Sequence, residues 1–153
     1  MQKHTPTPEP RRLGPAEFGE LADALLRDGD AVRFRAFGGS MAPLIPDGAT
    51  VTVAPVAPCA VRRGDVVLYR RESGTVAAHR VVRIPDASQA GFVVASDVGL
   101  LEPETVTASQ ILGRVRRVGA GRRTRGRRVL RDAARRTRAR LCVLRVRYLG
   151  RGK

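Results

Sequence analysis

Two short segments of the chain carry residue types that could do chemistry together. Residues 37–43 (Phe-Gly-Gly-Ser-Met-Ala-Pro) place Ser40 on a glycine-rich turn, where a substrate backbone can approach the hydroxyl. Residues 76–82 place His79 in an apolar run, and an imidazole that titrates near neutral pH can act as a general base. Each residue also has an ordinary structural interpretation. A turn serine can bond its own backbone, and a strand histidine can face solvent or bond a backbone group.

A serine hydroxyl is a weak nucleophile unless a base lies beside it. The chain has two histidines and two lysines, and all of them except His79 lie at its two ends. His79 is therefore the one conventional neutral nitrogen base that the body of the chain offers to Ser40. Asp97 directly follows the apolar run 92–96 and could orient the imidazole. As an alternative, Asp97 is simply the turn residue that ends a strand.

The elements that must position these residues are short. A chain of 153 residues with 42% hydrophobic residues suits one globular domain. Pro15 suits a first helical position, and apolar residues spaced at i, i+3, i+4, i+7 and i+8 predict a helix that ends at Asp28-Gly29. From Ala31 the apolar period changes to two, which predicts a strand, and further strands are predicted at 50–54, 65–70, 75–84, 92–96 and 110–118. We expect a mainly β fold with an N-terminal helix and a basic, partly helical C-terminal tail.

The positive charge gathers near the C-terminus. The formal net charge is +15, but residues 1–113 carry 12 basic and 13 acidic side chains, whereas residues 114–153 carry 17 basic side chains and one acid. We divide the chain into a disordered leader (1–12), a β-rich domain (13–118) and an Arg-rich tail (119–153), with a helix predicted over 127–149. The charge of the tail predicts attraction to an anionic membrane surface. The alternative is a run of solvated charges without a binding role. Nucleic acid is the less favoured partner, because Tyr148 is the one aromatic residue there and no nucleic-acid motif is present.

Other classes of site find little support in the sequence. Cys59 and Cys142 are too few for a disulfide framework and lack metal-ligand spacing, so we predict no metal and no cofactor. No apolar run has transmembrane length, and the N-terminus has no apolar signal-peptide region. We therefore expect a cytoplasmic protein, with peripheral binding at the inner membrane face as an extension of that prediction.

Five blocks in order along residues 31–118 resemble the type I signal peptidases and the self-cleaving SOS-type repressors. The blocks are 39–43 (Gly-Ser-Met-Ala-Pro), 64–69 (Gly-Asp-Val-Val-Leu-Tyr), 79–82 (His-Arg-Val-Val), an aspartate after a strand, and 111–115 (Ile-Leu-Gly-Arg-Val). Most bacterial members pair the serine with a lysine. The archaeal and endoplasmic-reticulum-type signal peptidases carry a histidine there, and His79 is similar to theirs.

The resemblance implies a β-rich peptidase in which Ser40 attacks a peptide carbonyl and His79 is the general base. Asp97 matches the aspartate of the family's Gly-Asp-Asn block, and Gly39, Ser40 and Met41 match the oxyanion and substrate-binding positions, with the Ser40 backbone N–H as the oxyanion donor. We therefore predict a soluble serine endopeptidase that cleaves a peptide or protein precursor through an acyl-enzyme. The alternative is a catalytically weak or inactive peptidase-like module that binds peptide, anionic membrane or nucleic acid.

The chain departs from the family pattern in several places. The Gly-Asp-Asn block has become Ser-Asp-Val at residues 96–98, and the second acidic position of the histidine-type enzymes is matched only by Glu102 or Glu104. Gly38 offers no hydroxyl as a second oxyanion contact. The membrane anchor of the signal peptidases is absent, so we expect the substrate to be met in the cytoplasm or at the inner leaflet.

Overall fold

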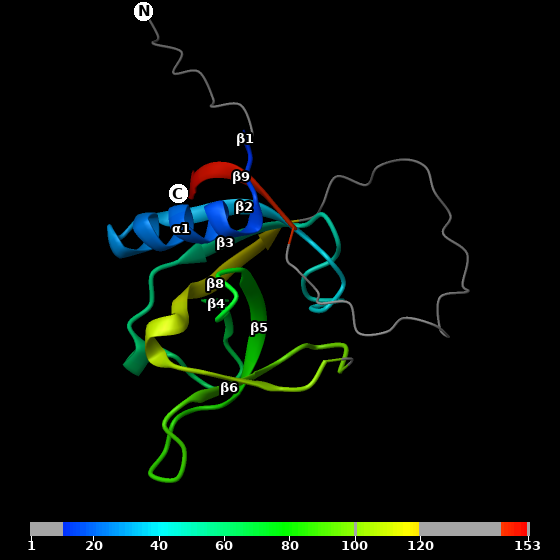
Figure 1. Cartoon of the computed structure of the whole chain (residues 1–153). Helices are drawn as coiled ribbons and strands as arrows, with labels where there is room; N and C mark the ends of the chain where they lie inside the picture. The colour runs from blue at the N-terminus through cyan, green and yellow to red at the C-terminus, as the bar shows by residue number, and fades with distance from the viewer. Residues whose placement is uncertain (1–10, 100, 120–144, 153) are drawn as a thin grey trace, which may run out of the picture.

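The computed structural model describes residues 11–99, 101–119 and 145–152, and it describes side chains within 13–99 and 101–119. These residues form one α-helix, α1 (Pro15–Arg27), and a single antiparallel sheet whose strand order is β1-β9-β2-β3-β8-β4-β5-β6-β7 (Figure 1). The mainly β class with an N-terminal helix is confirmed. The strands are β1 (Arg11–Arg12), β2 (Ala31–Phe37), β3 (Thr50–Ala54), β4 (Val66–Arg70), β5 (Val76–Arg83), β6 (Phe92–Ala95), β7 (Glu104–Val106), β8 (Ile111–Gly119) and β9 (Arg145–Gly152).

Helix α1 begins and ends where its sequence predicts. Pro15 occupies the first turn, and the Glu17 carboxylate accepts a hydrogen bond from the Gly14 N–H at 3.2 Å. Gly29 follows the helix with φ +88°, a conformation that L side chains rarely adopt. The helix buries one stripe against the sheet, so the amphipathic period determines its orientation. The buried residues of the stripe are Phe18, Gly19, Ala22, Leu25 and Leu26.

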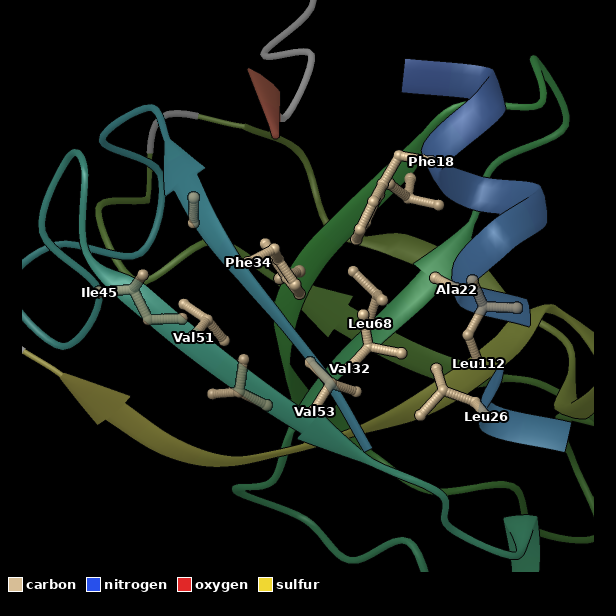
Figure 2. Close-up of a cluster of buried hydrophobic side chains, with 14 of the residues drawn as sticks. Phe18, Ala22, Leu26, Val32, Phe34, Ile45, Val51, Val53, Leu68 and Leu112 are labelled. Carbon is tan, nitrogen blue, oxygen red and sulfur yellow. The ribbon is translucent and has the colours of Figure 1, made fainter. Parts of the chain in front are cut away.

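Two groups of buried side chains lie on opposite faces of the central strands. The helix-side core joins α1 to the inner residues of β2 and β3, and Figure 2 shows Phe18 and Phe34 inside it, with ring centroids 4.9 Å apart. The second core is smaller and lies on the other face of β4 and β5, extending to β6 and β7. Alternate residues of β4 and β5 therefore lie in different cores. Because both faces of these strands are buried, their sequences are nearly continuous apolar runs. Members of the second core are Val61, Val67, Tyr69, Ala77, Val81, Phe92, Val94, Val106 and Ile111.

The C-terminal residues of the chain correct one prediction. Residues 145–152 form β9, which pairs with β2 along its length and with the short β1. The helix predicted over 127–149 is therefore wrong for its last five residues, where a strand extends the sheet beside β2. Alternating arginine and β-branched or aromatic residues at 145–148 fit a strand better than the imperfect helical stripe. Residues 120–144 of the predicted tail and 1–10 of the predicted leader lie outside the described residues.

Candidate functional site

Ser40 lies in the turn that follows β2, and hydrogen bonds within that turn fix its path. Gly38 has φ +117°, and its N–H donates to the Asp47 carboxylate at 2.8 Å. The Ile45 N–H donates to the Met41 carbonyl at 2.8 Å. The half-buried Ser40 also accepts, at its own carbonyl, a hydrogen bond from the Val98 N–H at 3.4 Å. The candidate nucleophile is therefore tied to the segment that follows β6, next to Asp97.

A small apolar cavity borders Ser40. It leaves about 10 Å³ for the centre of a water-sized sphere, roughly the space that one water molecule needs. Its size and its apolar walls suit a small apolar group, such as a methyl side chain. The other lining residues are Phe34, Ala36, Gly38, Met41, Ile45, Val51 and Ala78.

The two neighbours of Ser40 differ in their access to a ligand. Gly39 is exposed, and a Cβ added to it would meet nothing within 4 Å, so a substrate backbone can approach it closely. Met41 is buried in the helix-side core and forms part of the cavity wall. Its side chain therefore shapes the floor of the site.

His79 is buried on β5, with 3% of its surface exposed. Its Nδ1 lies 2.9 Å from the Tyr69 hydroxyl and 3.9 Å from Oε1 of Glu104. Burial lowers the pKa of His79 below its ordinary value of 6.5, and the Arg71 cation acts in the same direction, whereas the carboxylates of Glu104 and Asp97 oppose them. The imidazole is therefore neutral at pH 7, as a general base must be.

Ser40 and His79 approach β5 from different sides. Ala78 borders the Ser40 cavity and belongs to the helix-side core. Because consecutive strand residues point to opposite faces, His79 faces the second core together with Ala77 and Val81. The structure thus brings Ser40 next to the residue that precedes His79. No hydrogen bond joins the serine hydroxyl to the imidazole among the described side chains.

Asp97 has a different partner from the predicted one. Its two carboxylate oxygens accept hydrogen bonds from Arg80, at 2.8 Å from Nε and 2.7 Å from Nη2. Arg80 pairs with Ala95 across β5 and β6, and Asp97 lies two residues farther on the same face, which is the face opposite His79. The prediction that Asp97 bonds the imidazole is therefore corrected: Asp97 holds Arg80, whose Nη1 also donates to the Gly64 carbonyl at 2.8 Å.

The residues that do surround the imidazole are Tyr69, Arg71 and Glu104. Arg71 donates from Nε to Oε2 of Glu104 at 3.1 Å and makes a second contact, from Nη2 to Oε1. Of the two acidic residues considered from the sequence, Glu104 thus reaches the histidine, whereas Glu102 is exposed. Sequence reasoning missed Tyr69 and Arg71. Val67, Tyr69 and Arg71 are spaced two residues apart, which places them on one face of a strand. This signal was hidden because nearly every residue of β4 is apolar, so the two faces of the strand look alike in the sequence.

Ser96 is a second polar residue that the sequence reasoning did not select. It is 7% exposed, and its Oγ has no hydrogen-bond partner. Extending the β5–β6 register by one pair from Arg80 and Ala95 places Ser96 opposite His79. Leaving a buried hydroxyl without a partner costs free energy, and this hydroxyl lies opposite the candidate base. A test of the nucleophile must therefore include Ser96.

Within the described ranges, no group of three or more His, Cys, Asp or Glu side chains is arranged to hold a metal ion. Over the same residues, no helix has both the length and the apolar character needed to cross a membrane. No family model, curated protein or solved structure matches this chain.

Proposed function

We propose that the protein is a serine endopeptidase in which Ser40 is the nucleophile and His79 is the general base. The observation that carries this proposal is the position of Ser40 at the edge of a small apolar cavity, next to the residue that precedes a buried, neutral histidine. A peptide with a small apolar side chain in that cavity would present its carbonyl carbon to the hydroxyl. A peptide or a protein precursor is the substrate class, met in the cytoplasm or at the inner membrane face.

The reaction follows the chemistry of an acyl-enzyme. Ser40 Oγ forms a bond to the carbonyl carbon while Nε2 of His79 takes the hydroxyl proton. The backbone N–H groups of the turn, beginning with that of Ser40, stabilise the negative oxygen. The imidazolium then returns the proton to the leaving amine, and water hydrolyses the ester. In this structure Ser40 borders the helix-side face of β5 and His79 lies on its other face, so the proposed attack requires a rearrangement that brings both groups to one side of the strand.

Covalent labelling tests the nucleophile. The full chain is incubated with a fluorophosphonate probe, and the labelled residue is identified by mass spectrometry. We expect a label on Ser40 that is lost in Ser40→Ala and kept in Ser73→Ala, where an exposed turn serine is removed as a matched control. Cleavage of a mixed peptide substrate by the wild type, but not by Ser40→Ala, is the second measurement. Equal cleavage by the two proteins would contradict the proposal, and loss of label in Ser96→Ala alone would transfer the nucleophile to Ser96.

A second candidate function rests on a different observation. The adjacent strands β9, β2, β3 and β8 contain no Asp or Glu. Arg33 and Arg35 lie on the outer face of β2, because the residues that alternate with them are in the helix-side core. The register continues this basic character across the sheet: Arg33 pairs with Thr52, which pairs with Arg117, and Arg35 pairs with Arg147. We name the outer positions of these four strands the basic face.

The basic face fits an anionic membrane surface. Among the described side chains, no ion pair neutralises Arg33, Arg35 or Arg117. Anionic lipid headgroups would supply counter-charges to these arginines. Each arginine near such a surface contributes about 1 kcal/mol at physiological salt.

Vesicle binding tests the basic face. Wild type should bind vesicles of equal parts phosphatidylglycerol and phosphatidylcholine, and added salt should weaken the binding. Arg33→Gln/Arg35→Gln should bind roughly 30-fold more weakly, from about 1 kcal/mol per charge. The matched control is Arg62→Gln/Arg63→Gln, which removes two exposed arginines outside the four strands. Equal losses in both pairs, or binding to duplex DNA without binding to vesicles, would contradict this function.

A further inference from the structure

The loop that carries the candidate nucleophile is closed at its neck by a side chain. The backbone pairing of β2 with β3 ends at Ala36, whose N–H donates to the Ala49 carbonyl at 2.9 Å and whose carbonyl accepts the Gly48 N–H at 2.8 Å. Two residues farther along the chain, the same ladder would next use the Gly38 N–H. The Asp47 carboxylate accepts that N–H at 2.8 Å, in the place of a strand carbonyl. Asp47 therefore extends the pairing by one more step, to the base of the loop.

Two consecutive glycines precede Ser40, and glycine is the residue with the most backbone freedom. The first of them, Gly38, has φ +117°. The bond from its N–H to Asp47 fixes the part of the turn that the local sequence leaves free. We propose that Asp47 is a positioning residue for Ser40, because it holds the shape of the turn from which the hydroxyl attacks. The inference rests on the proposed function, which gives that hydroxyl its role as nucleophile.

Asp47 is itself aimed by a tight turn. Residues 46–49 form this turn, in which the Ala49 N–H donates to the Pro46 carbonyl at 3.0 Å and Gly48, at the third position, has φ +75°. The ring of Pro46 restricts the backbone that leads into Asp47. Because a backbone N–H can only donate and an ionised carboxylate can only accept, the direction of the bond to Asp47 is fixed by its chemistry. A bond of this charged kind is also stronger than one between neutral groups.

The rest of the turn is bonded within itself and only loosely to its surroundings. Inside the turn, the Ile45 N–H donates to the Met41 carbonyl at 2.8 Å. Toward the segment that follows β6, the Ser40 carbonyl accepts one longer bond, from the Val98 N–H at 3.4 Å. The neck is therefore the tighter attachment. With the neck closed, the turn can keep its internal shape during the rearrangement that brings Ser40 and His79 to one side of β5.

Amide hydrogen exchange of the full chain, followed residue by residue by NMR, tests this hold without any substrate. In the wild type the Gly38 N–H should exchange about tenfold or more slowly than the Gly39 N–H, which has no acceptor among the described residues. In Asp47→Ala this protection should be lost at Gly38 and reduced at Ile45, whereas Asp47→Asn, which keeps a carbonyl acceptor, should retain most of it. Glu72→Ala removes an exposed acid from the turn between β4 and β5 and should change neither amide. Equal exchange of Gly38 and Gly39 in the wild type would overturn the inference, even if Asp47→Ala does not fold.

Labelling kinetics separate positioning from a general loss of structure. At saturating fluorophosphonate probe, labelling of Ser40 should slow by about tenfold or more in Asp47→Ala, since a misplacement of about 1 Å can cost ~10²-fold in rate. The probe concentration that gives half the maximal rate should stay the same, and Asp47→Asn should restore most of the rate. Unchanged labelling in a folded Asp47→Ala, or equal slowing in both variants, would overturn the positioning role. Absence of label on wild-type Ser40 would remove the peptidase, and the exchange measurement would still decide whether Asp47 holds the turn.

Discussion

Glu104→Gln provides a direct measure of how much the Arg71–Glu104 pair contributes to the fold around the imidazole. The substitution keeps the shape of the side chain and removes its charge, so Arg71 keeps its position and loses its counter-ion. An exposed ion pair contributes about 0.2–1 kcal/mol, and breaking a fully buried one costs about 3–5 kcal/mol. The Arg71 and Glu104 side chains are 14% and 34% exposed, so this pair lies between the two limits. We therefore expect a loss of about 2 kcal/mol, close to the cost of removing hydrogen bonds to a charged group.

Urea unfolding of the full chain measures this loss. The chain contains no tryptophan, so far-UV circular dichroism is the suitable signal. A loss of about 2 kcal/mol lowers the unfolding midpoint by about 1 M at a slope of ~2 kcal/mol per M. Glu102→Gln is the matched control and should stay within about 0.5 kcal/mol of wild type. A double-mutant cycle with Arg71→Met should assign most of the loss to the pair. If Glu104→Gln were as stable as Glu102→Gln, the pair would contribute nothing and the assigned role of Arg71 would be wrong.

Four further predictions concern other parts of the structure. The pKa of His79 is lower in the folded chain than its ordinary value of 6.5, so between the folded and the unfolded pKa the unfolded chain binds more protons. The free energy of unfolding should therefore fall as the pH drops below about 6.5. Urea unfolding at several pH values measures this dependence, which should be missing in His79→Gln. Asp97→Asn should cost about 1 kcal/mol through Arg80 and leave the His79 tautomer unchanged in nitrogen NMR, so an altered tautomer would restore Asp97 as the orienting acid. Phe34→Ala should cost about 3–5 kcal/mol, because its ring is fully buried and packs against Phe18; a loss below about 1 kcal/mol would contradict the packing in Figure 2. Ending the chain at residue 144 removes β9 and should lower the thermal midpoint measurably, whereas an unchanged midpoint would show that the sheet does not need this strand.

The sequence by itself determined the elements whose signals are local. The helix at 15–27 follows from its capping residues and its 3.6-residue apolar period, and both the start and the end are encoded within a few positions. Strands β2 to β6 and β8 follow from apolar runs bounded by turn residues. The serine turn and the histidine within an apolar strand were also recognisable, because each is an unusual residue in a short and characteristic context; the burial of His79 was not predicted. These features depend on the backbone preferences and burial of neighbouring residues, which a single sequence contains.

Only the tertiary structure decided which side chains meet. Asp97 and Glu104 are both acidic residues near the same strands, and no local signal distinguishes them. The β5–β6 register places Asp97 on the face of Arg80, and the pairing of β7 with β6 places Glu104 on the face of His79. Strand β9 was also decided by the tertiary structure, because residues 145–152 form a strand by pairing with β2, which is far away in the sequence. The physical reason is the two-residue period of a strand: a shift of one residue moves every side chain to the other face, and the whole sheet fixes that register.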